Sequence, residues 1–181
     1  TGTPLVKTGT LTATTNGKVA YTGNGGTVTA ATYYNLDLKP SSSSDQVFGS
    51  GTFTVNNNFV IGDGTNAGAT GATNNPTLNV AGVLTIAAGA TFTTGTGTIT
   101  LSGTGTPFVK TGTFTVTNNN TFNYTGNGAT ILTAATYYNL GIKPGGTATH
   151  TFSSGTYTVG GNLTIGDGVN TGTAQANTND P

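Results

Sequence analysis

A tandem repeat constrains this fold more than any other feature of the sequence. The segment Thr1–Thr10 (TGTPLVKTGT) recurs with one substitution as Thr104–Thr113, 103 residues later. The segment Thr29–Leu36 (TAATYYNL) recurs unchanged as Thr133–Leu140, 104 residues later, so one residue has been inserted between the two matches. Self-similarity of this kind is typical of proteins built by stacking one structural unit.

The repeat divides the chain into two unequal parts. We expect residues 1–103 to form a first β-solenoid repeat and residues 104–181 a second, truncated repeat of the same continuous solenoid. The second copy stops at Asp180-Pro181, which corresponds to Asn75-Pro76 in the first. We therefore expect the native polypeptide to continue in both directions.

A shorter period lies inside the long one. Apolar residues alternate with Thr or Asn in brief segments, whose starts are often about 21 or 42 residues apart. The clearest are Gly9–Ala13, Gly51–Val55, Pro76–Val80, Gly97–Leu101, Gly112–Val116 and Gly155–Val159. Alternation with period two places the apolar side chains on one face of a strand and Thr on the other. The spacing predicts coils of about 20 residues, and four or five coils, roughly 19–24 Å of length, per repeat.

The composition favours strands throughout. Thr is the most frequent residue, 30 residues are Gly, and only 6% are charged. Thr, Val, Ile, Phe and Tyr suit a pleated sheet, and no long apolar pattern has the helical period. The fold class is thus expected to be all-β, a parallel β-solenoid with essentially no α-helix. Tandem immunoglobulin-like β-sandwiches are the alternative, since about 100 residues also make one such domain.

Two local patterns predict details of the coil. Pairs such as Asn16-Gly17, Asn24-Gly25 and Asn127-Gly128 are expected to supply positive-φ corners. The pairs Tyr33-Tyr34 and Tyr137-Tyr138 should each place one ring inside the solenoid and one outside.

The residue types disfavour catalysis. Glu and Arg are absent, and His150 is the single histidine. An enzyme acting on polysaccharides would need grouped acids and bases, so we expect no enzymatic activity and no catalytic residue. His150 corresponds to Gln46 in the first repeat, so the position does not require an imidazole. We therefore expect His150 to be a solvent-facing strand residue and not a ligand or a base.

Calcium is the one cofactor candidate, and it is suggested by the two Ile-Gly-Asp-Gly segments, residues 61–64 and 165–168. Asp63 and Asp167 are each followed closely by Asn, and Asp, Asn and carbonyl oxygens are suitable ligands for Ca²⁺. A calcium loop usually gathers more carboxylates, so an architectural corner is the expected role. The segments Thr65–Asn75 and Val169–Asp180 that follow are expected to bulge out as surface loops.

The charge balance excludes several partners. Five Lys and five Asp cancel to a formal net charge of zero, so binding to nucleic acid or to an anionic membrane surface is not expected. No apolar run approaches the roughly 20 residues of a membrane helix, so membrane insertion is not expected either. Cys is absent, which excludes disulfides. With so few ionisable groups, we also expect stability to change little between mildly acidic and mildly alkaline pH.

The pattern Gly-Thr-Phe-Thr-Val (residues 51–55) with Leu-Thr-Ile-Gly-Asp-Gly (residues 163–168) resembles a known class of sequence. It is similar to the Thr/Gly/Asn-rich tandem-repeat regions of giant bacterial surface or secreted β-helix proteins, of the adhesin and autotransporter-passenger kind. The resemblance covers the whole chain and carries over no catalytic residue. It implies an extracellular or cell-surface location and a fibre, stalk or adhesive role.

These observations lead to three functional hypotheses. The first is a structural repeat module of an extracellular fibre or filament, with copies of itself or further repeats of the same chain as end-to-end partners. The second is the stalk of a cell-surface adhesin. The third is an ice-binding β-solenoid with outward Thr ladders. Surface glycans on Asn or Thr are a further expectation that the sequence leaves open.

Overall fold

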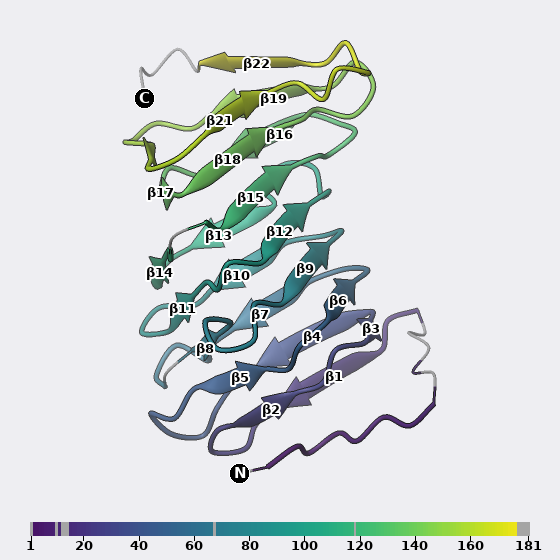
Figure 1. Ribbon diagram of the computed structural model, residues 1–181, viewed down its shortest axis with the longest axis vertical. Helices are drawn as coiled ribbons and strands as arrows, with labels where there is room; N and C mark the ends of the chain where they lie inside the picture. The colour runs from purple at the N-terminus through teal and green to yellow at the C-terminus, as the bar shows by residue number, and fades with distance from the viewer. Residues whose placement is uncertain (1, 10, 12–14, 67, 118, 177–181) are drawn as a thin grey trace.

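The computed structural model describes residues 2–9, 11, 15–66, 68–117 and 119–176. These residues form short β-strands and no helix, and all their strand pairs are parallel. The strands stack as successive rungs, with the two termini at opposite ends of the stack (Figure 1). The predicted β-solenoid is confirmed. The alternative of immunoglobulin-like sandwiches is wrong, because those domains are built from antiparallel sheets.

The strands are two to four residues long. They are β1 (Lys18–Tyr21), β2 (Gly26–Val28), β3 (Thr32–Tyr33), β4 (Asn35–Leu38), β5 (Gln46–Phe48), β6 (Thr52–Val55), β7 (Phe59–Ile61), β8 (Ala69–Thr70), β9 (Thr77–Val80), β10 (Leu84–Ile86), β11 (Thr91–Thr93), β12 (Thr98–Leu101), β13 (Phe108–Lys110), β14 (Thr113–Thr115), β15 (Thr121–Tyr124), β16 (Thr130–Leu132), β17 (Thr136–Tyr137), β18 (Asn139–Ile142), β19 (Thr149–Phe152), β20 (Thr158–Val159), β21 (Leu163–Ile165) and β22 (Thr173–Ala176). Most of the predicted Gly9–Ala13 strand lies outside the described residues.

The chain visits three faces in a fixed order, so three strands make one coil. Face A is the sheet β1-β4-β7-β10-β13, face B is β14-β11-β8-β5-β2, and face C is the seven-stranded sheet β21-β18-β15-β12-β9-β6-β3. The sheet β16-β19-β22 continues face A through a parallel bridge between Gly105 and Thr130, and β17-β20 follows face B in chain order. One coil takes roughly 23 residues rather than the expected 20, because a third short strand and its corner add to each coil.

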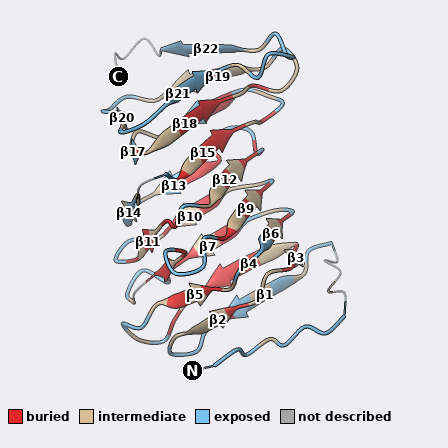
Figure 2. Ribbon diagram, in the orientation of Figure 1, coloured by how far each residue is buried: buried red, intermediate tan, exposed pale blue. Residues whose placement is uncertain are grey.

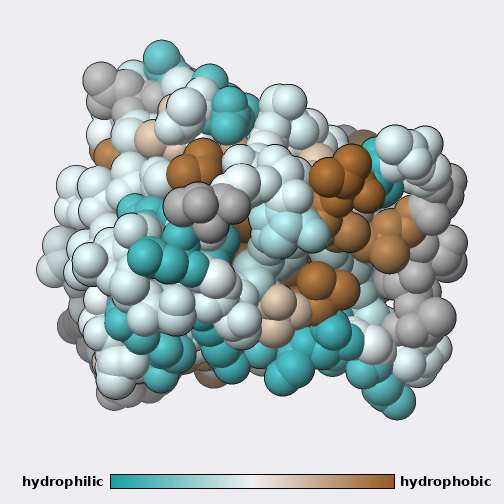
Figure 3. Space-filling model, turned by 90° about the horizontal axis from the view of Figure 1, so that it is seen from below, coloured by the Kyte–Doolittle hydropathy of each residue, from teal (hydrophilic) through white to brown (hydrophobic). Residues whose placement is uncertain are grey.

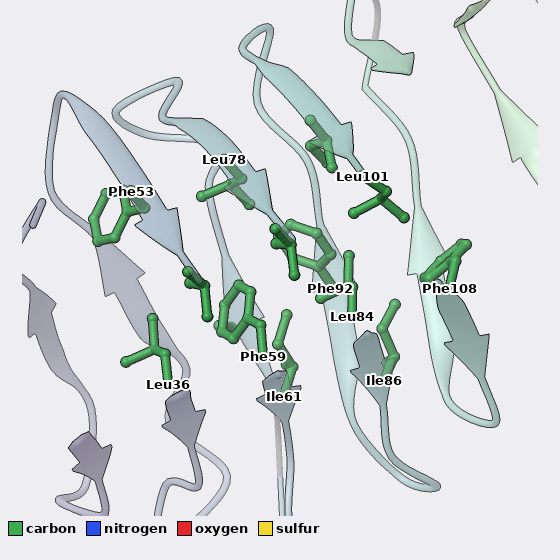
Figure 4. Close-up of a cluster of buried hydrophobic side chains, with 14 of the residues drawn as sticks. Leu36, Phe53, Phe59, Ile61, Leu78, Leu84, Ile86, Phe92, Leu101 and Phe108 are labelled. Atoms are coloured by element: carbon green, nitrogen blue, oxygen red, sulfur yellow. The ribbon is translucent and has the colours of Figure 1, made fainter. Parts of the chain in front are cut away.

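The core is a set of apolar columns parallel to the solenoid axis. On face A, Leu36, Phe59, Leu84 and Phe108 stand in register on four successive strands (Figure 4). Each of these side chains is fully buried. Burial is highest in the middle of the stack and lower in the strands at both ends (Figure 2). The predicted alternation of inward apolar and outward polar residues therefore builds one shared interior.

Asparagine side chains repeat the coil-to-coil bonding at one corner. Asn35 Oδ1 accepts hydrogen bonds from Asn57 Nδ2 at 2.9 Å and from the backbone N–H of Asn58 at 3.2 Å. The equivalent Asn139 Oδ1 accepts from the backbone N–H of Asn162 at 2.9 Å. The corner is thus held by the same contact in both repeats, which accounts for Asn at these positions.

The predicted positive-φ corners are partly correct. Asn16 has φ 64° and Gly25 has φ 70°, as the Asn-Gly pairs indicate. The prediction for the pair Asn127-Gly128 is wrong, since neither residue has a positive φ. The segment after Asp63 is also more ordered than a bulging loop, because it contains β8, whose Ala69 is fully buried in the core. A two-residue strand leaves no alternation to detect in the sequence.

The sequence repeat and the coil are out of phase. The equivalent strands β1 and β15 are fourteen strands apart, which is four coils and two strands. Accordingly β1 lies on face A, whereas β15 lies on face C. The neighbours are nevertheless preserved, since β1 pairs with β4 in the first repeat and β15 with the equivalent β18 in the second. The second repeat is therefore the first one turned by about a third of a turn around the axis.

Candidate functional site

The two Asp corners are closed by their own hydrogen bonds. Asp63 Oδ1 accepts from the backbone N–H groups of Thr65 and Asn66, both at 2.9 Å, and Oδ2 accepts from Asn66 Nδ2 at 3.0 Å. Asp167 makes the corresponding contacts with the backbone N–H groups of Val169 and Asn170, at 2.9 and 2.8 Å. These are Asx-type turns, in which the carboxylate stabilises the corner.

Those donors also set the electrostatics of the two carboxyls. Hydrogen bonds from Asn66 and Thr65 lower the pKa of Asp63 well below its ordinary value. Bonds from the backbone of Asn170 and Val169 lower the pKa of Asp167 to about 2. Both carboxylates are satisfied by N–H donors, and the described residues hold no group of three or more His, Cys, Asp or Glu side chains arranged for a metal. Calcium at these corners stays a prediction.

His150 is buried, which contradicts the prediction of a solvent-facing residue. It lies in β19 with no exposed surface, and its Nε2 is 3.1 Å from the carbonyl oxygen of Gly126. In the first repeat, Gln46 Nε2 donates to the carbonyl of the equivalent Gly23 at 2.9 Å. The imidazole therefore reproduces a glutamine contact with Nε2–H as donor. The alternation of side chains along β19 shows that neighbouring residues point to opposite faces. It does not show which of them point inward until the pairing of the strand is known.

The burial of His150 has an electrostatic consequence. Desolvation lowers the pKa of the imidazole, and the hydrogen bond to Gly126 opposes this only in part. Its Nδ1 has no hydrogen-bond partner, and neither has the corresponding Oε1 of Gln46. The position thus requires one buried donor in both repeats, which glutamine and neutral histidine both supply.

The tyrosine pairs behave as predicted. Tyr33 and Tyr137 are buried, whereas Tyr34 and Tyr138 are only partly covered. Tyr137 Oη donates to the carbonyl of Thr133 at 2.6 Å and lies 3.0 Å from Tyr124 Oη. The equivalent hydroxyls of Tyr33 and Tyr21 are 3.2 Å apart. The inner hydroxyls are thus satisfied within the core of each repeat.

The described residues form two ion pairs, and both involve Asp37. Its Oδ2 is 3.3 Å from Lys18 Nζ and 3.0 Å from Lys39 Nζ, and the carboxylate side chain is 6% exposed. The second repeat has Gly141 at the place of Asp37, so this cluster is not repeated. His150 lies in β19, whereas the Asp63 corner follows β7, and no hydrogen bond joins the two side chains. Within the part of the chain that the structure describes, no Asp forms an ion pair with His150.

Face C carries a regular array of uncharged polar groups. One column runs in register through Thr32, Thr54, Asn79, Thr100, Asn123, Gly141 and Thr164, of which Asn123 and Gly141 are buried. A second column contains the register pairs Thr52–Thr77 and Thr98–Thr121. No Lys or Asp lies within the strands of this face. The sequence could not assign these Thr residues to one surface, because the third-of-a-turn rotation mixes the repeats among the faces.

The N-terminal end of the solenoid is hollowed and apolar (Figure 3). A cavity of about 420 Å³ is lined by Pro4, Leu5, Leu11, Val19, Ala20, Tyr21, Thr22, Gly23, Gly25 and Gln46. Sequence reasoning missed this feature. Leu5, Leu11 and Val19 stand at the positions of Phe108, Phe114 and Phe122 in the second repeat.

The described part of the chain has no helix long and apolar enough to cross a membrane. Comparisons with known proteins assign the chain to no family. No protein-family model matches the chain, and neither a curated protein nor a solved structure is similar enough to match it.

Proposed function

We propose that this chain is a structural, non-catalytic repeat module of an extracellular fibre or filament. The observation that carries the proposal is the unbroken parallel pairing across the boundary between the repeats. β10 of the first repeat pairs with β13 of the second, and β12 pairs with β15. A repeat therefore joins the next one as one coil joins another, and length grows with the number of repeats.

The surface supports a passive mechanical role. Outward positions are mostly Thr, Asn and Gly, and the formal net charge is zero. The proposed extracellular location rests on the resemblance to secreted β-helix repeats. An adhesin stalk would use the same module, with a binding domain elsewhere in the polypeptide.

The proposal is tested by lengthening the chain by one full repeat. Four coils and two strands at about 4.8 Å per coil predict a gain of about 22 Å in length and no change in cross-section. Small-angle scattering, extrapolated to zero concentration, measures both quantities within a single chain. A thicker particle of unchanged length would contradict the proposal, because it would mean that repeats pack side by side.

Face C favours ice binding as a second candidate function. The register pairs Thr32–Thr54, Thr52–Thr77 and Thr98–Thr121 place hydroxyl groups about 4.8 Å apart between strands, and β6 and β12 place two of them about 6.7 Å apart along a strand. A charge-free, regular array is suited to an ordered, uncharged surface such as ice. We expect Thr54→Lys with Thr100→Lys to abolish any thermal hysteresis, and Thr85→Lys on face A to leave it unchanged. Normal ice growth with the unmodified protein would dismiss this candidate.

A further inference from the structure

His150 and Gln46 occupy equivalent buried positions that differ in one chemical property. His150 lies in β19 and Gln46 in β5, and both have almost no exposed surface. Each Nε2 faces the carbonyl oxygen of the equivalent glycine, Gly126 at 3.1 Å and Gly23 at 2.9 Å. An imidazole can take up a proton in the mildly acidic range, whereas an amide cannot. The two repeats therefore make the same contact with different responses to acid.

The contact with Gly126 fixes the tautomer of the neutral ring. A carbonyl oxygen only accepts hydrogen bonds, so Nε2 must carry the hydrogen and Nδ1 must hold a lone pair. The same carbonyl also accepts from the backbone N–H of Gly145 at 3.0 Å. Protonation of the ring therefore adds a hydrogen at Nδ1.

Nδ1 has no partner for that hydrogen. It is buried and makes no hydrogen bond to any of the described residues. The neighbours of His150 in register are Thr130 in β16 and Ala174 in β22. The Thr130 hydroxyl donates to the carbonyl of Gly128 at 3.0 Å, and Ala174 has no polar side chain. A charged ring would thus be buried with an unsatisfied donor, which costs free energy.

The strands on either side of His150 supply no compensating charge. β16 and β22 contain no Lys and no Asp. Lys143 and Asp167 are the charged residues of the adjoining segments, and neither forms an ion pair with the ring. Burial lowers the pKa of the imidazole, and the bond to Gly126 opposes this only in part. The titratable core side chains of these coils are phenols, which are neutral in acid: Tyr124, Tyr137 and Tyr157.

We propose that His150 is an acid-sensitive latch, whose protonation separates β19 from β16 and β22 and hydrates the ring. The proton comes from solvent and binds at Nδ1, so neutral pH closes the coil again. The coil that contains β5 has Gln46 at the equivalent position and stays closed. The inference concerns the opening of one coil, and it holds whether or not the chain builds a fibre.

Amide hydrogen exchange, measured by mass spectrometry at pH 8 and pH 5.5, tests the latch. The unmodified protein is compared with His150→Gln at each pH, so that the intrinsic exchange rates cancel. Peptides from β16 and β19 report the opening, and peptides from β5 and β12 are controls within the same chain. Far-UV circular dichroism at both pH values establishes that the variant is folded.

The expected result is a local change in the ratio of exchange rates, unmodified protein to variant. In β16 and β19 this ratio should rise by about threefold to tenfold between pH 8 and pH 5.5. The upper limit follows from the ordinary histidine pKa of about 6.5, which the ring regains in the opened coil. In β5 and β12 the ratio should stay constant.

Two results would overturn the inference. A constant ratio in β16 and β19 would mean that the ring is protonated without opening the coil, or not at all. An equal rise in β5 and β12 would mean that acid loosens the whole solenoid and not one coil. Because His150 is the single histidine, its ring signals in nuclear magnetic resonance can be followed without overlap. They should titrate with a midpoint below about 6.5, and a midpoint at or above that value would also contradict the latch.

Discussion

Gln46 and His150 show what a single buried position in the coil requires. Both side chains donate from Nε2 to the carbonyl of an equivalent glycine, Gly23 or Gly126. Both leave a second polar atom buried without a partner. The position requires one hydrogen-bond donor that reaches the glycine carbonyl. Burial lowers the pKa of the imidazole and so favours its neutral form.

This position gives a pH prediction. The folded-state pKa of His150 is lowered by burial, so the folded protein binds this proton less readily than the unfolded chain. The free energy of unfolding should be unaffected above the ordinary histidine value of about 6.5 and should fall as the pH drops below it. The buried imidazole thus restricts the expected pH independence to the neutral and mildly alkaline range.

His150→Gln tests this by copying the first repeat. At pH 8 the variant should match the unmodified protein within about 1 kcal/mol. Urea unfolding at pH 8, 6.5 and 5.5 should show a stability difference that grows in favour of the variant as the pH falls, because other titrating groups cancel in the comparison. A difference that does not depend on pH would mean that the imidazole is already hydrated in the folded state.

The buried tyrosines predict the behaviour at high pH. Burial raises the pKa of Tyr33, Tyr124 and Tyr137. Since the folded values exceed the ordinary value of about 10, their contribution to stability is complete below pH 10 and is lost as the pH rises above it. Tyrosinate absorbance from these rings should appear in one steep step together with the loss of circular dichroism. Gradual ionisation of every tyrosine with intact circular dichroism would contradict this.

At the scale of the strand and its corners, stacking distance decides which residues are tolerated. A Cβ on Gly112 would lie 2.2 Å from the carbonyl oxygen of Ala87 and 2.4 Å from that of Ala90. Both atoms belong to the preceding coil. For the equivalent Gly9 in the first repeat, no atom of the described residues lies within 4 Å of the corresponding Cβ position.

This matched pair measures the closeness of coil stacking. Gly112→Ala should lower the free energy of unfolding by about 1–3 kcal/mol, because backbone atoms of two coils must move apart. Gly9→Ala should change it by less than about 0.5 kcal/mol. Urea unfolding of the two variants checks both values under one condition. Equal effects would show that the glycines act through the unfolded chain and not through the contact.

At the scale of the whole molecule, each coil is stabilised by the two coils beside it. Strands β9 and β12 have a neighbour on both sides, whereas β1 and β22 have one. Amide hydrogen exchange should therefore be slowest in β9 and β12 and fastest in the end strands. Mass spectrometry at low protein concentration measures this exchange. Uniform protection of the amides along the stack would contradict the predicted gradient.

The rotation between repeats also belongs to this scale. Each repeat advances by four coils and two strands, so equivalent corners such as those of Asp63 and Asp167 point in directions about a third of a turn apart. Three repeats would bring a corner back to its starting face. A surface feature that occurs once per repeat is thus distributed around the rod rather than along one side.

The sequence by itself determined the class of fold, because the properties that define it are local. Alternation around Phe53 and Leu163 specifies strands and their inward side chains, and the matched segments at Thr29 and Thr133 specify tandem stacking. The Asp corners were likewise predictable, since an Asx turn closes within three residues.

Only the tertiary structure decided how the coil closes. Strands as short as Thr32–Tyr33 carry no periodic signal, so neither the three-strand coil nor its length of roughly 23 residues could be read from the sequence. The phase between coil and repeat and the burial of His150 follow from that closure. Each depends on which strand lies next to which, and parallel pairing sets this between residues some twenty positions apart.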